Sequence, residues 1–438
     1  MMTKMMFGGL VVFASLSACT KTVHQCSKDS DCTNLAYPFC DVNGQYAASG
    51  GEHDICTIVP PDCPVERCGC QPGAATCVSG TLAVCNSDGQ TTTSTACDLG
   101  CSASNVTCQT FEPFFGTGVV LPDALVAADV TISSGSTIDS DTGNVRDSNN
   151  NAVPIAHRFV AQGTGNDIQV FYAHAFTIDD VRVTGSHPVS FVSAGPLLVR
   201  GKLDVGAHAS QPGPGSTLTG ACAGKYGGDS SIGFVGGGAG NSTPGGSGDT
   251  MLHESGMPGP TGLPGDTQTG FANLIGGCPG GSDGTNGGGG GGAIQLVSFA
   301  NISIVGAVSV GGGGGNSQGG GGSGGNLVME APTVSVAGVV AANGGGGGAC
   351  ASLAADGGFG GSPALGPSCM GLHGGAGAAG MTGPGAGQPF KNGIAGGGPA
   401  GGGGALGRML VRTAAGTFTP GSGSTISVAA SIDTLNIH

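Results

Sequence analysis

Residues 291–310 read GGAIQLVSFANISIVGAVSV, and residues 324–343 read GGNLVMEAPTVSVAGVVAAN. Ile302 in the first stretch corresponds to Val334 in the second, and Gly306 corresponds to Gly338, both at a spacing of 32 residues. Each copy holds segments in which apolar and small polar residues alternate with a period of two, the pattern of β-strands. A glycine separates two such segments within each copy. The chain therefore carries an internal repeat of short strands.

The same pattern extends in both directions from these two copies. A looser copy lies at Leu197–Gly206, and a late one includes Met409–Arg412 and Thr425–Val428. Further strands are predicted at Val130–Ile138, Ile168–Tyr172, Phe176–Val183 and Val189–Val192. Such a repeat predicts an all-β fold in which residues 111–438 form a parallel β-helix, or β-solenoid, whose inward Ile, Val and Leu stack into a narrow core. This core needs no tryptophan, and the chain has none.

Glycine is concentrated between the copies, where it forms long insertions. Only 18 of the 93 glycines precede residue 201. The short run after Val310 fits a tight turn with positive φ. The longer runs after Gly206 and Asn343 fit either mobile loops or segments of polyproline-II type packed side by side, an approach that only glycine permits. Four cysteines lie within the long insertions: Cys222, Cys278, Cys350 and Cys369. Two disulfides among them would favour ordered insertions.

The N-terminus carries an export signal. Lys4 is followed by an apolar run from Phe7 to Phe13, too short to span a bilayer, and then by Leu16-Ser17-Ala18-Cys19. These last four residues resemble the lipobox of bacterial lipoproteins. The resemblance implies that residues 1–18 are a signal peptide, that Cys19 receives a diacylglyceryl group and often an acyl chain such as palmitate on its amine, and that residues 19–25 are a lipidated tether. The membrane is then a partner through the lipid on Cys19. Thr20 is not the aspartate that resembles an inner-membrane retention signal, so the outer membrane of the cell envelope is expected.

Residues 26–110 form a cysteine-rich region. Its cysteines are Cys26, Cys32, Cys40, Cys56, Cys63, Cys68, Cys70, Cys77, Cys85, Cys97, Cys101 and Cys108. In an exported chain, an even number at this density predicts small disulfide-rich modules, because so short a region with few large apolar side chains needs bridges worth roughly 2–4 kcal/mol each. The spacing leaves the pairing open. A zinc site is the competing interpretation, but no Cys-x2-Cys pair occurs.

Composition excludes several function classes. The balance of 13 Lys and Arg against 27 Asp and Glu gives a net charge of −14, which argues against nucleic acid or anionic lipid as a partner. No nucleophile elbow, zinc-protease helix or phosphate loop occurs. The calcium-binding nonapeptide does not recur either, and the aspartates of the glycine-rich part are isolated in the sequence, namely Asp229, Asp249, Asp266, Asp283 and Asp356. We therefore expect neither a metal nor a cofactor.

Two functions remain open, besides a purely structural coat component. Parallel β-helices include polysaccharide lyases and hydrolases, and the densest polar cluster on predicted strands is His174, Asp179, Asp180, Arg182 and His187. Asp179 and Asp180 are adjacent, so in a strand they would point to opposite faces and form no catalytic pair alone. The chain as a whole resembles surface lipoproteins and adhesin-like proteins of Gram-negative bacteria, and its glycine bias is similar to that of phage tip adhesins. We therefore expect a non-enzymatic envelope protein with no catalytic residue, which binds glycans or surface proteins or acts as a structural element.

Overall fold

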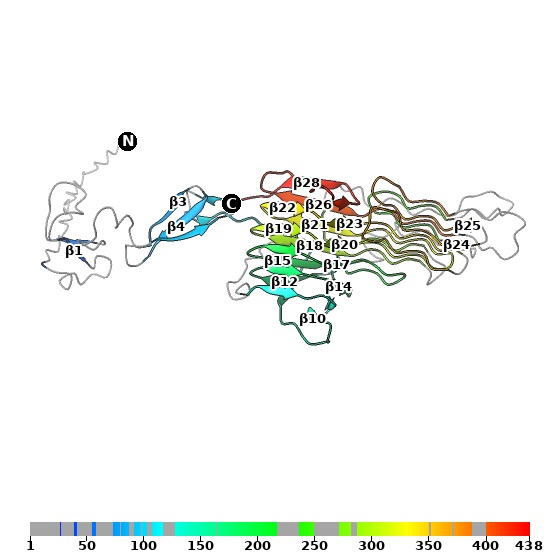
Figure 1. Ribbon diagram of the computed structural model, residues 1–438, viewed down its shortest axis with the longest axis horizontal. Helices are drawn as coiled ribbons and strands as arrows, with labels where there is room; N and C mark the ends of the chain where they lie inside the picture. The colour runs from blue at the N-terminus through cyan, green and yellow to red at the C-terminus, as the bar shows by residue number, and fades with distance from the viewer. Residues whose placement is uncertain are drawn as a thin grey trace, which may run out of the picture. The chain divides into compact units, whose positions relative to one another are not determined.

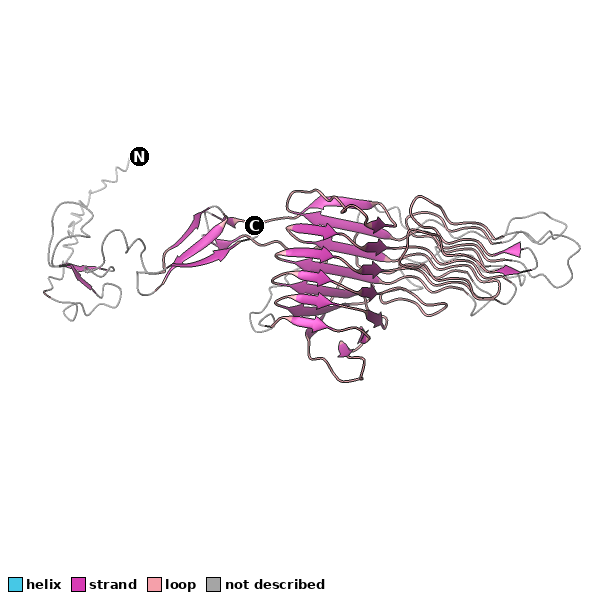
Figure 2. Ribbon diagram, in the orientation of Figure 1, coloured by secondary structure: helices cyan, strands magenta, loops and turns pink. Residues whose placement is uncertain are grey.

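A computed structural model gives the fold of the chain. It describes residues 27, 39–41, 55–57, 73–78, 80–86, 92–97, 99–102, 107–116, 128–163, 165–216, 236–248, 271–281, 287–349, 352–369, 372–387 and 400–438. The described residues form strands, turns and extended segments without any helix (Figure 2). Contacts divide the chain into two compact units, Met1–Cys108 and Gln109–His438. The chain is therefore all-β, as predicted. The predicted signal peptide and tether lie outside the described residues.

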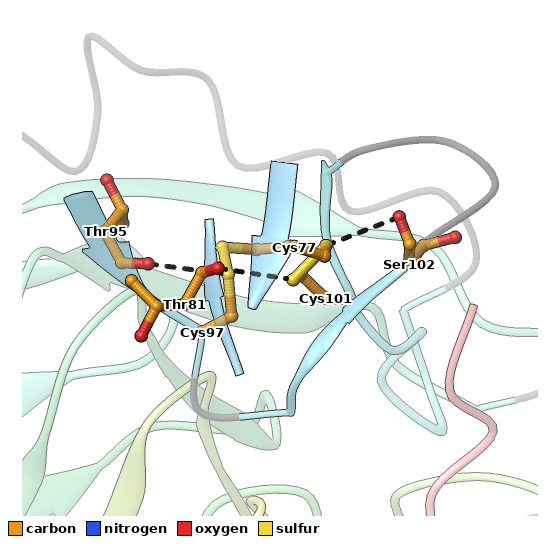
Figure 3. The surroundings of a disulfide bond; sticks show 7 residues. Cys77, Thr81, Thr95, Cys97, Cys101 and Ser102 are labelled. Atoms are coloured by element: carbon orange, nitrogen blue, oxygen red, sulfur yellow. Dashed lines mark hydrogen bonds between the residues drawn. A yellow bond between two sulfur atoms is a disulfide. The ribbon is translucent and has the colours of Figure 1, made fainter. Parts of the chain in front are cut away.

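The described residues of the N-terminal unit form short antiparallel strands, some of them held by disulfides. Its strands are β1 (Phe39–Asp41), β2 (Ile55–Thr57), β3 (Ala75–Val78), β4 (Thr81–Cys85), β5 (Thr92–Ala96), β6 (Cys101–Ser102) and β7 (Thr107–Cys108). Strands β3, β4 and β5 form one sheet, while β1–β2 and β6–β7 are separate pairs. Disulfides join Cys77 to Cys101 and Cys97 to Cys108. The first of these brings the β3 strand to the β6–β7 pair (Figure 3).

The second unit contains three sheets of mostly parallel strands (Figure 1). Sheet 1 has the order β22 (Thr333–Val336), β19 (Asn301–Ile304), β16 (Leu197–Val199), β13 (Phe176–Ile178), β8 (Val130–Ile132). Sheet 2 has the order β10 (Asn144–Arg146), β9 (Ser136–Asp139), β14 (Val181–Thr184), β17 (Lys202–Asp204), β20 (Ala307–Ser309), β23 (Val339–Ala341), β27 (Thr425–Ile426). Sheet 3 has the order β11 (Ala156–Val160), β12 (Ile168–Ala173), β15 (Val189–Ser193), β18 (Ala293–Ser298), β21 (Asn326–Glu330), β26 (Arg408–Thr413), β28 (Ala430–Thr434). Only β10 and β11, each at an edge, run antiparallel to their neighbours.

The repeat seen in the sequence sets the register of these sheets. Ile302 lies beside Val334 in sheet 1, and the N–H of Val339 donates to the carbonyl oxygen of Gly306 at 2.9 Å where the chain passes into sheet 2. The predicted spacing of 32 residues is therefore confirmed. In sheet 3 the spacing is 33, because Ala293 pairs with Asn326. The bend between sheets 3 and 1 is thus one residue shorter in the second copy.

Glycine at the bend between sheets 1 and 2 is required by space. A Cβ on Gly306 would collide with the carbonyl oxygen of Gly201, and one on Gly338 would collide with that of Gly306. The backbones of successive passages touch here, as the predicted separating glycine implied. Two strand predictions were wrong at the equivalent bends upstream. Val130–Ile138 is two strands, β8 and β9. Phe176–Val183 is not one strand but two, β13 and β14, and Asp179 and Asp180 form the bend between them.

The core is a stack of inward side chains in register from strand to strand. In sheet 3, one row runs Phe171, Phe191, Leu296, Met329 and Val411, all fully buried. The phenyl rings of Phe171 and Phe191 stack at 5.3 Å between centroids. Aromatic side chains thus fill the early part of the core and aliphatic ones the later part. Rows of this kind bury large apolar areas without tryptophan.

Candidate functional site

The most unusual element of the second unit is a set of glycine-rich excursions. Each is a connection that begins after a strand of sheet 2 and ends before a strand of sheet 3. They run from β17 to β18, from β20 to β21 and from β23 to β26, and span residues 205–292, 310–325 and 342–407. The last one includes the small pair β24 (Ser368–Cys369) and β25 (Leu372–His373). Their described parts extend side by side beyond the ends of the strands (Figure 2). We call these parts the glycine bundle.

Hydrogen bonds define how the bundle is packed. In the central segment 319–325, the N–H of Gly320, Gly321 and Gly322 donates to Gly281, Gly402 and Gly313, at 2.8–2.9 Å. Ser323, Gly324 and Gly325 then donate to the same three segments in the same order, through Cys278, Ala405 and Val310. Three further segments donate to the carbonyl oxygens of this segment, from Gly348, Gly288 and Ala239 to residues 319, 320 and 321. The direction of bonding therefore rotates with a period of three residues, which is that of a polyproline-II helix.

A second segment repeats this arrangement. Residues 401, 402 and 403 donate to Gly348, Gly236 and Gly385, and residues 404 and 405 return to the first two segments through Gly345 and Ala239. Its carbonyl oxygens accept from three other segments. Each of these two segments thus has six hydrogen-bonded neighbours. Backbone groups that a free loop would give to water are paired within the protein.

Glycine is needed in the bundle because neighbouring backbones pack too closely to leave room for a Cβ atom. A Cβ on Gly321 would collide with the carbonyl oxygen of Gly345, and one on Gly322 would collide with that of Gly289. Positive φ is not the reason, because no glycine of 287–292, 311–315, 319–325 or 401–407 has it. The packed alternative of the sequence analysis is therefore confirmed for the described segments. The prediction of a tight turn after Val310 was wrong, since residues 311–315 and 319–325 are two segments of the bundle.

The bundle carries almost no charge. Among its described residues, only His208, Asp356 and His373 are ionisable. Such a surface offers backbone amides and small side chains. It can therefore recognise a partner through hydrogen bonds and apolar contact, and long-range attraction of charge has little part.

The predicted carboxylate and basic cluster is dispersed into structural pairs. Asp179 accepts two hydrogen bonds from Arg200, at 2.7 and 2.8 Å, and these chiefly hold its pKa below the ordinary value. Asp180 accepts from the N–H of Lys202 at 2.9 Å. His174 lies 2.7 Å from Asp129. These groups fasten one passage of chain to the next.

The remaining two residues of that cluster are also engaged. His187 Nδ1 lies 2.8 Å from the carbonyl oxygen of Asp167. Arg182 lies 3.6 Å from Asp204. The five residues therefore do not converge on one point where a substrate could react.

One cluster was missed because its members are distant in the sequence. Asp356, isolated in the sequence, lies 3.5 Å from His208 Nδ1, and Asp204 lies 2.8 Å from Nε2 of the same ring. The other oxygen of Asp356 accepts from the N–H groups of Ala209 and Gly314, at 2.8 and 2.7 Å. The cluster thus joins three excursions at the base of the bundle. Because the two carboxylates flank opposite ring nitrogens, they cannot share a metal ion with His208.

A buried ion pair fastens the first residues of the second unit. Glu330, fully buried, accepts from Arg412 Nη1 at 2.6 Å, from Gln295 at 2.5 Å and from the N–H of Phe114 at 3.0 and 3.1 Å. Burial raises the pKa of Glu330, whereas Arg412 and the hydrogen bonds act in the opposite direction. Residue Thr110 also exchanges two hydrogen bonds with His438, each 3.0 Å. No pattern of residues in the sequence predicted either contact.

Where the structure describes both cysteines of a bridge, the disulfide contradicts a zinc site there. Cys97 and Cys101, whose thiolates a zinc site would need, are each in a disulfide. Their sulfur environment is formed by backbone carbonyls, since the sulfur of Cys101 lies 3.6 Å from the oxygen of Thr81 (Figure 3). Cys40, Cys85 and Cys278 are disulfide-bonded as well.

Other predicted sites are not described. The backbones of Cys56 and Cys369 lie in β2 and β24, without described side chains. Outside the described residues lie Cys19, Cys26, Cys32, Cys63, Cys68, Cys70, Cys222 and Cys350, together with Asp229, Asp249, Asp266 and Asp283. In the described ranges, His, Cys, Asp and Glu form no group of three that could hold a metal ion. The same ranges contain no helix with the length and apolar character needed to cross a bilayer.

Comparison with known proteins adds no relative. No protein-family model, no curated protein and no solved structure matches this chain.

Proposed function

We propose that this chain is a lipid-anchored, non-enzymatic protein of the cell envelope, most simply of the outer membrane, in which a parallel β-solenoid presents the glycine bundle as a binding surface or structural element. The anchor rests on the resemblance of Leu16–Cys19 to a lipobox. Two or three acyl chains on Cys19, at about 0.8 kcal/mol per buried CH₂, would hold the chain at a membrane without a spanning helix.

The solenoid is supported by the order of the strands. From β13 to β23, the chain visits sheet 1, sheet 2 and sheet 3 in a repeating sequence, and each strand from β13 to β21 pairs in parallel with its counterpart in the next passage. The core rows and the 32-residue spacing follow the same order. A stack of this kind is stabilised mainly by contacts between neighbouring passages.

The observation that carries the proposed function is the packing of the glycine bundle. Its central segments use their backbone groups in three-residue rotation, so the bundle is rigid and fixes the position of any loop or surface that it bears. It is also nearly free of charge. A rigid neutral surface suits hydroxyl-rich partners such as glycans, which bind through hydrogen bonds and apolar contact.

The alternative of a polysaccharide lyase or hydrolase is less well supported. Such chemistry needs an acid and a base that converge on the substrate. The described candidates are instead used in pairs such as Asp179 with Arg200, and both ring nitrogens of His208 face carboxylates.

The test is a binding experiment with residues 20–438 against a panel of glycans and cell surfaces, with assay of released products. We expect saturable binding without turnover. A Gly321→Val variant, which disrupts the bundle, should lose binding, whereas Gly383→Val should keep it because a side chain there meets open space. Circular dichroism of both variants checks that the sheets remain. Turnover of a bound glycan would overturn the non-enzymatic assignment, and absence of binding together with high abundance would favour a coat component.

The anchor is tested separately. Cells that express the chain are labelled with a palmitate analogue and fractionated. We expect label in the outer-membrane fraction and its loss in a Cys19→Ser variant. Label that persists in Cys19→Ser would contradict the lipobox.

A further inference from the structure

The two ends of sheet 3 differ. At one end the edge strand β11 runs antiparallel to β12 and carries the basic residues His157 and Arg158. At the other end, β28 pairs in parallel with β26, and none of the described strands lies beyond it (Figure 1). Open edge strands are templates for pairing with another chain, and proteins usually cover or charge them. The edge of β28 is therefore a candidate site for pairing with another chain.

The backbone of β28 is directed toward that partner. The N–H of Leu435 donates to the carbonyl oxygen of Thr413 at 3.1 Å, which sets the phase of the parallel ladder. In this phase Ser431 and Asp433 bond to β26, while the N–H and C=O of Ala430 and Ile432 point away from it. The side chain of Ile432 is 47% exposed.

The single charge on β28 lies at one end of this edge. The carboxylate of Asp433 lies 4.0 Å from Arg412 of the neighbouring strand, and it accepts from the N–H of Thr434 at 2.8 Å. The carboxylate thus occupies the edge N–H of Thr434, and pairing with another chain rests on the backbone groups of Ile432. The other four residues of the strand are uncharged.

We propose that β28 pairs antiparallel with β28 of a second copy, about a two-fold axis through Ile432. In this register the two Ile432 residues exchange two backbone hydrogen bonds, and Ser431 of each copy faces Asp433 of the other. No like charges face each other, and the exposed apolar residue meets its own copy. A single strand pair is a small interface, so the dimer is weak and depends on concentration.

The test uses a pair of charge variants at one exposed position. The complete chain, purified in detergent, is measured by sedimentation velocity over a concentration series, as wild type, Ser431→Lys and Ser431→Asp. We expect a concentration-dependent dimer of the wild type. Lysine at 431 would face Asp433 and lower the dimer dissociation constant by about two- to thirty-fold, whereas aspartate would raise it by a similar factor, because two such pairs form per dimer.

Thermal midpoints should be the same for all three chains, since residue 431 is exposed. A wild-type chain that stays monomeric throughout would overturn the proposal. So would a dimer that both variants weaken, which indicates residue 431 facing itself in a parallel register, or a dimer that neither variant alters.

Discussion

Replacing Gly321 by alanine would place one methyl group at the centre of the glycine bundle. The new Cβ would collide with the carbonyl oxygen of Gly345, so the two segments must separate by on the order of 1 Å. Overpacking of this kind costs about 1–3 kcal/mol. The two nearby hydrogen bonds, from Gly321 to Gly402 and from Gly345 to Gly322, would weaken at about 0.5–1.5 kcal/mol each.

Alanine also restricts the unfolded chain, which offsets about 0.4–1 kcal/mol of this loss. The expected net destabilisation is therefore about 3 kcal/mol, within a range of about 1–5 kcal/mol. Gly383→Ala is the matched control, because a Cβ there meets no atom within 4 Å and the residue is exposed. That variant should be unchanged or slightly more stable.

Scanning calorimetry suits this comparison because the chain has no tryptophan to report unfolding by fluorescence. We expect a fall of several degrees in the melting temperature of Gly321→Ala and none in Gly383→Ala. Limited proteolysis should reveal new cleavage between residues 311 and 325 in the first variant only. Equal melting temperatures for the two variants would refute the argument that close packing dictates glycine here.

Three further predictions follow from other contacts. Glu330→Ala should destabilise the second unit by about 3–5 kcal/mol because it leaves Arg412 buried without its partner, and Glu330→Leu combined with Arg412→Met should restore most of that loss; chemical denaturation monitored by circular dichroism measures both. The pKa of Asp179 is lowered in the folded state, so its contribution to stability is present above its unfolded pKa of about 3.9 and is lost as the pH falls through the lower folded value. The Asp179→Asn variant should therefore melt below the wild type at neutral pH and converge with it in acid, and an unchanged difference between melting temperatures would contradict this. Reduction of Cys77–Cys101 and Cys97–Cys108 should make residues 73–108 sensitive to protease before strands β12 to β21 are cut, because each bridge contributes about 2–4 kcal/mol to a unit with a small core; simultaneous cleavage of both units would count against it.

Much of the second unit was predictable because its information is local and periodic. The match of Ile302 with Val334, and of Gly306 with Gly338, predicted neighbours that the sheets contain. Alternation with a period of two identified the inward side chains. Both features depend on residues that are close in sequence or related by the repeat.

Other features were not predictable because they depend on contacts without a local signal. Asp179 and Asp180 looked like strand residues, yet they form a bend whose position depends on packing against the passages on either side. The contact between Phe114 and Glu330 spans 216 residues, and the contact of Ala209 with Asp356, beside His208, spans 147. No pattern of residue types indicated either.

The glycine bundle could be predicted only in part. The amino-acid composition left two alternatives for these residues, mobile loops or packed segments, and favoured neither. The choice depends on whether enough segments lie side by side to satisfy one another's backbone groups, which is a property of the whole set. Segment 319–325 is central because the excursions before and after it surround it.

Amide hydrogen exchange measured by mass spectrometry tests this account most directly. The peptides compared are those that span residues 311–325 and 400–407 and those that span β18 and β21. If the bundle is packed as described, the amides of residues 320–325 and 401–405 exchange slowly, at rates close to those of the core strands. Exchange of these amides at the rate of an unstructured chain, while β18 and β21 stay protected, would contradict the central claim that the glycine segments form a rigid, hydrogen-bonded bundle.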